Sequence, residues 1–522
     1  MDSYVIDGAA VNKLMDSVVI AGDAVVKLMD SFVIDTDAVV RQLLYDPKNP
    51  LLFNNGFFVY FFFLFILLYY LFRERYTART VILSAFSLYF FYKASGSFVL
   101  LVIISAIIDF FLSNLIYRQQ KLFAKRILLV LSIVTNLGLL FYFKYTNFFI
   151  EICNDSFSAG FHPLNIILPV GISFYTFENL SYTVDVYHGK IEPEKKFLNY
   201  LLFLSFFPKL VMGPIVRASD FIPQLKKPYV VTERNFVDGF YLIFSGLFKK
   251  VVISDYITQN FVNYIFDGPS LHTGLECLLA VYGYAIVIYC DFSGYSDVAI
   301  GIAKWLGITI PANFNSPYKS SSISDFWRRW HISLSSWLRD YLYKPLGGSR
   351  CGTFRTYINL IVTMLLGGLW HGASWNFIVW GGLNGGALAV HKVWSGLHKK
   401  KASNNGGVAN VLSIILTFHF VCLGWIFFKA SSFELAFQMI QQILFDFSFD
   451  GITPFLENYR SVVMMISLGF ILHVLPDSLT EYVKTRLEKL PLVSSVFVFL
   501  VFVVVYAYFK SSEPIMPIYL QF

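Results

Sequence analysis

The chain has 522 residues, of which 56% are hydrophobic and only 14% are charged. A soluble protein carries roughly 25% charged residues, so this chain has too little charge to cover a surface that faces water. The formal net charge of +7 is spread over loops between apolar runs, a distribution that argues against nucleic-acid binding. The five cysteines are scattered without a C-x-x-C pair, so neither a disulfide framework nor a metal site is predicted.

Residues 1–50 contain a repeat, whose three copies begin at Met1, Met15 and Met29. Two interpretations stay open: an amphipathic surface arm, or a tandem duplication around the start codon, which is favoured because every copy begins with methionine. The segment is acidic and lacks the continuous apolar core of a signal peptide. We therefore place it outside the fold and predict a single domain over residues 51–522.

From residue 57 onward, long apolar runs alternate with short polar connections. A helix needs about 20 apolar residues to cross the hydrocarbon core, with about 17 as a lower limit. The sequence therefore predicts an all-α polytopic membrane protein with roughly 11 or 12 membrane segments, including re-entrant or interfacial ones. The clear runs are 57–72, 97–117, 127–143, 277–290, 359–379, 411–428, 461–475 and 492–509, and the weaker ones are 81–94, 165–187, 200–216 and 239–253.

Four cationic clusters between these segments orient the chain, because such loops normally face the cytoplasm. Two segments separate the first cluster from the second, and two separate the third from the fourth, so all four can lie on one side. This predicts a multi-pass protein of the cell (inner) membrane, with both termini and the 144–165 and 431–460 loops outside. The clusters are Arg73, Arg75 and Arg79; Arg118, Lys121, Lys125 and Arg126; Lys399, Lys400 and Lys401; and Lys484, Arg486 and Lys489.

Three stretches concentrate polar residues in this apolar background, where each charge costs about 2.5–3.5 kcal/mol. In "FPKLVMGPIVR", Phe207–Arg217, two prolines and a glycine break any helix, which suits a cavity lining and a kinked connection equally. In Tyr289–Ile308, Asp291 and Asp297 are too poorly aligned for an acid–base pair, so helix capping or pairing with nearby arginines is favoured.

The third stretch is "SDFWRRWHISLSSWLRDYLYKPLGG", Ser324–Gly348. Ser324 or Asp325 can cap a helix there, and Pro345 with the glycines after it can end one, so one continuous helix is predicted. An interfacial amphipathic helix would explain its apolar stripe, and a single buried histidine is more often structural than functional. The stripe consists of Trp327, Trp330, His331, Leu334, Leu338 and Tyr341.

A second histidine changes this interpretation of His331. In "LLGGLWHGASWNF", residues 365–377, His371 also follows a tryptophan, and glycines 367, 368 and 372 surround it. Histidine is the side chain best suited to move protons near neutral pH, and the glycines would leave room for a substrate. The pair therefore predicts a buried proton-transfer site, whereas His419 and His473, alone in membrane runs, are interpreted as structural.

These stretches, together with "NFNSPY", closely resemble the membrane-bound O-acyltransferase family, and within it the bacterial branch that includes the membrane subunit of alginate O-acetylation. The resemblance covers roughly residues 50–522. It implies a central funnel, with His371 as the catalytic residue and His331 as its companion. It also implies an acyl group taken from a cytoplasmic donor and passed through the bilayer to an acceptor outside.

From this resemblance we expect acetyl transfer from acetyl-CoA for O-acetylation of a cell-envelope polysaccharide, either an alginate-like exopolysaccharide or peptidoglycan. We expect no bound cofactor or metal, and an extracytoplasmic esterase-like acetyltransferase as partner. A base must take the hydroxyl proton, and dry tryptophan walls would exclude water. Arginines would attract the phosphates of the donor. The expected substrate-binding residues are Trp330, Trp370, Arg328, Arg329 and Asp291, with Arg339 as a further cation near the donor.

Acetyl transfer has two alternatives. D-alanyl transfer to a teichoic-acid-type polymer is disfavoured by the two further membrane segments at the C-terminal end. A transporter would also use buried charges and broken helices, but internal repeats of its membrane half would be expected and are not found. The chain ends "PIYLQF", which departs at two positions from the F-I-Y-F-Q-F ending common in the branch, so we assign the tail no role.

Overall fold

The computed structural model describes residues 36–397, 407–449, 452–511 and 515–520. The packing of the chain defines two units, Met1–Pro50 and Leu51–Phe522. In the first unit, helix α2 (Thr36–Leu43) covers the end of the third repeat copy. The rest of the repeat, at 1–35, lies outside the described residues.

The second unit is built from helices, and no strand occurs in the described part of the chain. Its α-helices are α3 (Gly56–Leu71), α4 (Tyr76–Ser95), α5 (Val99–Arg118), α6 (Leu122–Phe157), α7 (Ile172–Tyr187), α8 (Phe197–Ser205), α9 (Phe207–Leu210), α10 (Ala218–Leu225), α11 (Glu233–Leu247), α12 (Asn263–Asp267), α13 (Gly274–Trp305), α14 (Ile323–Arg329), α15 (Ile332–Leu338), α16 (Thr353–His371), α17 (Trp375–Leu397), α18 (Gly407–Lys429), α19 (Phe433–Phe445), α20 (Ile452–Asn458), α21 (Arg460–Val474), α22 (Asp477–Glu488) and α23 (Leu492–Phe509). Short π-helical or 3₁₀ turns are η1 (Gly96–Phe98), η2 (Phe248–Asp255), η3 (Thr258–Val262), η4 (Pro269–Leu271), η5 (Pro317–Lys319), η6 (Arg339–Tyr343) and η7 (Ile518–Leu520).

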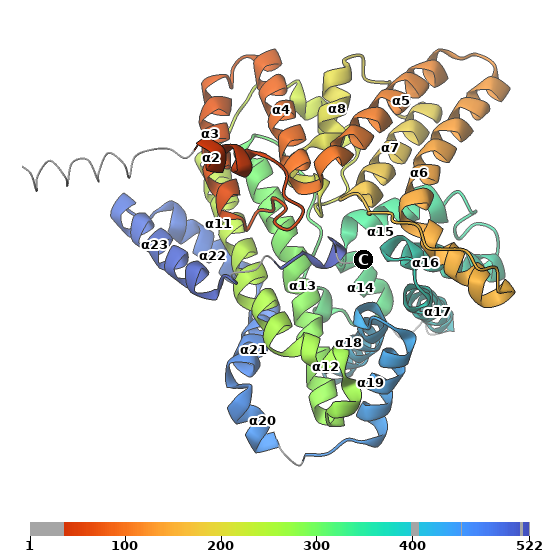
Figure 1. The fold of residues 1–522 in the computed structure, drawn as a ribbon, viewed down its shortest axis with the longest axis vertical. Helices are drawn as coiled ribbons and strands as arrows, with labels where there is room; N and C mark the ends of the chain where they lie inside the picture. The colour runs from red at the N-terminus through yellow and green to blue at the C-terminus, as the bar shows by residue number, and fades with distance from the viewer. Residues whose placement is uncertain (1–35, 398–406, 450–451, 512–514, 521–522) are drawn as a thin grey trace, which may run out of the picture. The chain divides into compact units, whose positions relative to one another are not determined.

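Four helical stretches in the described residues are long and apolar enough to cross a membrane, or five if the pair α20–α21, bent by 84°, counts as one span. The other predicted segments fall on shorter, broken or more polar helices (Figure 1). The prediction of an all-α polytopic membrane protein is confirmed. The four stretches are Tyr76–Arg118, Leu122–Phe157, Gly274–Trp305 and Gly407–Lys429.

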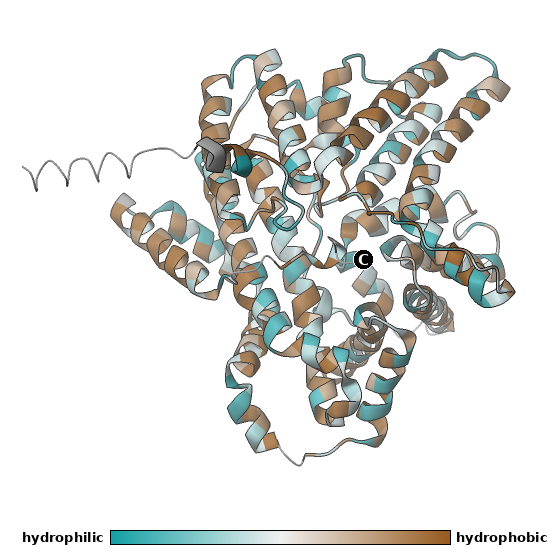
Figure 2. Ribbon diagram, in the orientation of Figure 1, coloured by the Kyte–Doolittle hydropathy of each residue, from teal (hydrophilic) through white to brown (hydrophobic). Residues whose placement is uncertain are grey.

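In Figure 2, α5 and α6 consist mostly of hydrophobic residues with scattered polar ones. On α6, Val134 is 60% exposed, whereas Ser132 and Asn136 on the opposite face are buried. Both donate to Asp109 of α5, with 2.6 Å from Asn136 Nδ2 to the carboxylate. Asn179 of α7 joins them by donating to Asn136 at 3.1 Å. Because lipid cannot hydrogen-bond, such polar groups must find partners between helices.

Helix α11 packs directly against α13, and glycines make the close approach possible. A Cβ atom on Gly294 would lie 2.6 Å from the carbonyl oxygen of Gly246, and one on Gly301 would lie 2.6 Å from that of Gly239. Small residues at such crossings let two backbones touch within a membrane. The contact fixes α13 as the central helix against which the site is assembled.

The predicted run 359–379 is not one helix, because it bends back between α16 and α17. The two helices pack as a hairpin in which a Cβ atom on Gly381 would lie 2.5 Å from the carbonyl oxygen of Met364. The last residue of α16 is His371, so the hairpin places this histidine at a helix end inside the protein.

Enlarging the α11–α13 contact should destabilise the fold. We expect Gly246→Ala to lower the midpoint of thermal unfolding in detergent, because overpacking a tight contact costs about 1–3 kcal/mol. Gly138→Ala on α6 is the matched control, because nothing lies within 4 Å of its added methyl group. A Gly246→Ala midpoint at or above that of the unsubstituted chain would contradict this account of the crossing.

Candidate active site

His331 lies at a break between two short helices, so the prediction of one continuous helix over Ser324–Gly348 is wrong. Helix α14 ends at Arg329, Trp330 is extended, and His331 has left-handed backbone angles of φ 42° and ψ 56° before α15 begins. Positive φ is uncommon for a residue with a side chain, and such strain concentrates at functional sites. The cap of α14 is Ser322, whose hydroxyl accepts from Asp325 N at 3.2 Å.

The neighbouring segment that begins at Asn313 satisfies the backbone at this break. Ile332 N donates to the Asn313 carbonyl at 2.9 Å, and Asn315 N donates to the Arg329 carbonyl at 2.9 Å. These bonds allow the helix to open without leaving buried donors unpaired. The apolar stripe predicted from the sequence is therefore interrupted between α14 and α15.

The side chain of Asn313 fixes the imidazole of His331. Asn313 Oδ1 accepts from the backbone N–H of Ser333 at 3.2 Å and from its hydroxyl at 2.8 Å, so this atom must be the amide oxygen. His331 Nδ1 lies 3.2 Å from the same oxygen and therefore carries a proton that it donates. A neutral imidazole has one protonated nitrogen, which leaves Nε2 of His331 with a free lone pair.

The broken segment Phe207–Arg217 contacts Ser333 and so supports the Asn313–His331 contact. Ser333 Oγ accepts from Ile215 N at 3.0 Å, and Val216 N donates to Glu178 Oε1 on α7 at 3.1 Å. The other carboxylate oxygen of Glu178 forms a buried ion pair with Lys209. The sequence suited a cavity lining and a kinked connection equally. The structure shows the second: the segment is a buried, kinked connection that positions α15.

His371 is held by cationic and hydroxyl donors from α6. Lys144 Nζ donates to the carbonyl oxygens of Trp370 at 2.6 Å and His371 at 2.8 Å, and the Tyr145 hydroxyl donates to that of Leu369 at 2.7 Å. The last carbonyls of a helix have no partner within it and carry partial negative charge. Lys144 and Tyr145 supply those partners and so fix the end of α16.

The glycines around His371 serve helix packing. A Cβ atom on Gly368 would collide with the carbonyl oxygen of Phe377, and one on Gly372 with the Phe377 ring. A Cβ atom on Gly367 would lie 3.3 Å from Leu338. The prediction that Gly368 and Gly372 leave room for a substrate is therefore wrong, because the returning helix α17 occupies that space.

The fold brings the two histidines to one buried cluster of aromatic rings. The Trp370 ring centroid lies 4.9 Å from that of His371 and 6.2 Å from that of His331, and Tyr519 lies 5.4 Å and 6.1 Å from them. Among the described residues, no group hydrogen-bonds to Nε2 of His331 or Nδ1 of His371. Two buried imidazole nitrogens are thus available for an exchangeable proton.

The other predicted site residues lie at different distances from the histidines. Trp370 borders both rings and donates from Nε1 to the Ser173 carbonyl at 3.4 Å. Trp330 is buried with its ring 4.9 Å from that of Trp425, in a cluster that reaches His371 through Trp380 and Phe428. Asp291 is buried on α13, where Lys250 pairs with it at 2.5 Å, so its partner is a lysine and not an arginine.

The predicted arginines lie toward the protein surface. Arg328 is exposed, and Arg329 pairs with Asp325 at 3.0 Å. Arg339 pairs with Asp340 at 3.1 Å, where Lys344 also binds at 2.7 Å. Burial by itself would raise the pKa of Asp340, but the hydrogen bonds and charges of Arg339 and Lys344 hold that pKa below its ordinary value.

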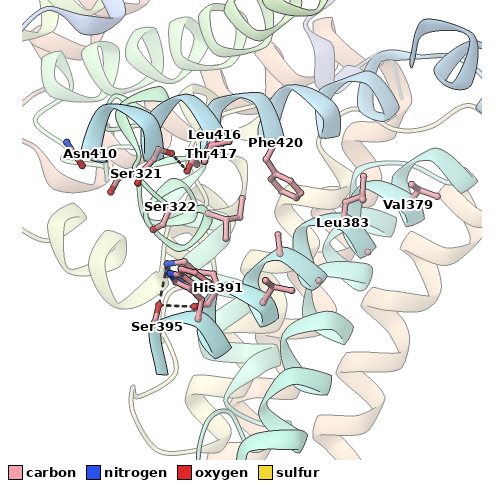
Figure 3. A pocket seen from close by; sticks show the side chains of 17 residues that line it. Ser321, Ser322, Val379, Leu383, His391, Ser395, Asn410, Leu416, Thr417 and Phe420 are labelled. Atoms are coloured by element: carbon pink, nitrogen blue, oxygen red, sulfur yellow. Dashed lines mark hydrogen bonds between the residues drawn. The ribbon is translucent and has the colours of Figure 1, made fainter. Parts of the chain in front are cut away.

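A groove of about 1470 Å³ opens between α17 and α18 beside the start of α14 (Figure 3). Leu383, Leu416 and Phe420 give it apolar walls. Its polar groups include His391, which contacts Ser324 Oγ at 2.8 Å and experiences the charge of Arg328. The groove is therefore an apolar cavity with a cation close to its polar lining.

Three residues that shape the site have no predicted role in the sequence. Asn313 belongs to the "NFNSPY" motif, but only its contact with His331 shows what it does. Lys144 is one cation in the long apolar helix α6, an unusual position that could have marked it. Tyr519 comes from the tail, which lies more than a hundred residues from either histidine in the sequence.

Fold and site together define a polytopic all-α membrane protein that buries two imidazoles in an aromatic cluster. Residues 193–436 match the model of MBOAT, the membrane-bound O-acyltransferase family. The chain is 38% identical over 381 residues to the peptidoglycan O-acetyltransferase of Helicobacter pylori, covering 68% of this chain and 72% of that protein. It belongs to the membrane-bound O-acyltransferase family and is an O-acyltransferase.

Two further relatives are similar to this chain over a smaller part of its length. The probable alginate O-acetylase AlgI of Pseudomonas aeruginosa is 41% identical over 318 residues, which cover 60% of this chain and 59% of that protein. The teichoic acid D-alanyltransferase of Bacillus subtilis is 31% identical over 290 residues, which cover 52% of this chain and 71% of that protein. The chain therefore spans less than two thirds of the alginate relative and resembles the D-alanyltransferase more distantly.

Removing the Asn313 acceptor should impair the site without unfolding the protein. We expect Asn313→Ala to lower acyl transfer per folded molecule by about 10- to 100-fold, part of the 10²–10⁴-fold that a positioned acid–base group contributes. Asn199→Ala is the matched control, because Asn199 is equally buried and accepts from the Tyr76 hydroxyl, away from both histidines. Equal rates in the two variants would show that the contact of Asn313 with the His331 ring does not matter for transfer.

Proposed function

We propose that this chain transfers an acetyl group from acetyl-CoA, on the cytoplasmic side, toward the O-acetylation of a cell-envelope polysaccharide outside. The observation that carries the proposal is the buried histidine pair, whose free ring nitrogens border one aromatic cluster. The relatives named for peptidoglycan and alginate acetylation support the acetyl group and the polysaccharide class. An extracytoplasmic esterase-like acetyltransferase would complete the transfer to the polymer.

The residues supply the proton transfers that an acyl transfer needs. His371 takes the proton of the acceptor hydroxyl as its oxygen attacks the thioester carbonyl carbon. A carbon–oxygen bond forms, the carbon–sulfur bond breaks, and the imidazolium returns its proton to the leaving thiolate. The Nδ1 proton of His331 is committed to Asn313, so its free Nε2 accepts a hydrogen bond from a second hydroxyl of the acceptor and orients that molecule, while the proton of the reacting hydroxyl goes to His371. Trp370 and the rings around it keep competing water away.

Arg328 is the proposed contact for the phosphates of the donor. Its guanidinium is exposed, and its charge acts on His391 in the lining of the groove between α17 and α18. Guanidinium groups bind phosphate strongly through paired hydrogen bonds. Arg329 and Arg339 are less available, because each pairs with an aspartate.

The protein lies in the inner membrane with its cationic clusters toward the cytoplasm. The orientation requires the cationic clusters to lie at one end of the helical unit, and two contacts near the first and fourth clusters support this. Arg79 of the first cluster donates to the Leu225 carbonyl at 2.8 Å. Arg234, near the start of α11, pairs at 2.5 Å with Glu481 of α22, the helix that carries part of the fourth cluster. At the opposite ends of α3 and α23, the Tyr506 hydroxyl donates to the Asn54 carbonyl at 2.7 Å. The start of α3 and the end of α23 then face outside, whereas the tail turns back into the protein.

D-alanyl transfer to a teichoic-acid-type polymer is the second candidate. Its support is the relative from Bacillus subtilis, at lower identity and over a smaller part of this chain. The two candidates use the same proton chemistry and differ in the donor, so supplying purified membranes with radiolabelled acetyl-CoA or D-alanyl carrier protein distinguishes them.

Replacing His371 tests the proposed chemistry. We expect His371→Ala and His371→Gln to lose envelope O-acetylation, because neither side chain can carry the proton, a loss of about 10²–10⁴-fold. His331→Ala should retain more activity, since the proposed role of His331 is to orient the acceptor molecule and not to take the reacting proton. The measurement is acetate released from isolated polysaccharide, normalised to membrane-extracted protein. His419→Gln is the control, because His419 bonds the Tyr282 hydroxyl on an exposed helix face. Near-normal specific activity in His371→Ala would refute the assignment.

Cysteine labelling of intact cells tests the orientation. In a chain without its native cysteines, Ser158→Cys at the end of α6 should react with an impermeant maleimide, and Lys121→Cys at its start should not. Both positions are exposed, so access differs only by membrane side. Labelling of position 121 without labelling of position 158 would invert the proposed topology.

A further inference from the structure

The last described residues of the chain run into the helical unit and end near α14 and α15 (Figure 1). Pro517 and Ile518 are buried, and the next residue, Tyr519, reaches the site. Its ring centroid lies 4.5 Å from that of Phe292 on α13 and 6.2 Å from that of Trp370. The tail therefore forms one wall of the proposed active site, although it reaches the site from the far end of the sequence.

A buried carboxylate anchors this tail. Asp291 on α13 accepts the backbone N–H of Ile518 on one oxygen at 2.8 Å, and its other oxygen pairs with Lys250 of η2 at 2.5 Å. Lys250 also pairs with Asp255 at 2.7 Å. Asp291 is 1% exposed, and a hydrogen bond to an ionised acceptor in such surroundings is about twice as strong as a neutral one.

The charge balance of this cluster makes the tail contact costly to lose. Two carboxylates face one ammonium group, so Asp291 needs further donors beyond its share of Lys250. If the tail left, the Asp291 oxygen that accepts from Ile518 would lose that donor inside the membrane protein. Uncompensated buried charge is strongly unfavourable. The ion cluster therefore favours the docked position of the tail.

A neighbouring ion pair shows that pairing alone does not require the tail. Asp297, six residues further along α13, pairs with Lys249 at 2.6 Å. Its side chain is 21% exposed, against 1% for Asp291, and no hydrogen bond joins it to the described part of the tail. The same two elements thus carry a matched pair of contacts, one with the tail and one without it.

We propose that Asp291, held by Lys250, is a positioning residue that fixes the C-terminal tail so that Tyr519 closes the space beside His331 and His371. Its effect on rate rests on the proposed acetyl transfer, whereas its effect on the tail does not. The Asp291 carboxylate acts through the Ile518 backbone and does not touch the reacting atoms.

The position of the tail can be measured directly. In the full-length purified chain without native cysteines, the Tyr519→Cys variant reports access to N-ethylmaleimide. We expect Asp291→Ala to speed labelling by about 10- to 100-fold, the range for losing a hydrogen bond to a buried charged acceptor. Asp297→Ala is the matched control and should label at the original slow rate. Equal rates for Asp291→Ala and Asp297→Ala would overturn the proposal.

A substitution on the tail itself keeps the test independent of the folding of α13. Ile518→Pro removes the N–H donor at the first position of η7, where proline is tolerated, and should speed labelling as Asp291→Ala does. Ile518→Val keeps the N–H and should label slowly. Slow labelling of Ile518→Pro would overturn the anchoring role of this hydrogen bond.

Turnover measured with Tyr519 in place completes the test. We expect Asp291→Ala and Ile518→Pro to lower kcat by about tenfold or more while the KM for acetyl-CoA changes little, since the tail borders the histidines and not the donor arginines. Faster labelling with unchanged kcat would overturn the positioning role. If the unsubstituted chain transfers no acetyl group, the proposed function fails, and the labelling rates still decide whether Asp291 holds the tail.

Discussion

Removing polar groups from water is the constraint on which this structure depends. Lipid offers no hydrogen bonds, so each polar group between the helices needs a partner within the protein. The chain meets this need where it is regular, through contacts such as Asp109 with Ser132 and Asn136. It also meets it where helices break, because Asn313 and Glu178 supply acceptors to the opened backbone. Irregular backbone is therefore possible at membrane depth, and the site is built from it.

The same constraint gives the two histidines their chemical character. No ion pair joins either ring to a carboxylate among the residues that the structure describes, so the charged imidazolium has no fixed counter-ion. Asn313 selects the tautomer of His331, and the donors from α6 hold the end of α16 without occupying the His371 ring. Each imidazole thus keeps a nitrogen for a mobile proton, while tryptophan and phenylalanine rings surround it. A proton-transfer site follows from the way polar groups are satisfied around it.

The charged side chains inside the protein hold structural elements in place and do not contact the substrate directly. Lys209 and Glu178 support the segment behind His331, Lys144 caps the helix that ends at His371, and Lys250 with Asp291 holds the tail. A buried charge without a partner would lower the stability of the fold, so each of these contacts fixes the elements that it joins. The exposed cation Arg328 lies outside this framework and is the one proposed to meet an anionic donor. Buried pairs and surface arginines therefore have different tasks in the same molecule.

Composition and apolar runs by themselves determined that this is an all-α membrane protein, because the apolar content needed to span lipid is local in the sequence. The motifs around His331 and His371 also indicated the family and the chemistry. Only the tertiary structure decided that the predicted helix through His331 breaks and that Phe377 occupies the space beside the glycines near His371. It also decided that Asn313, Lys144 and Tyr519 converge on the site. Such contacts join residues far apart in sequence, and periodicity carries no information about which distant segment satisfies a buried polar group.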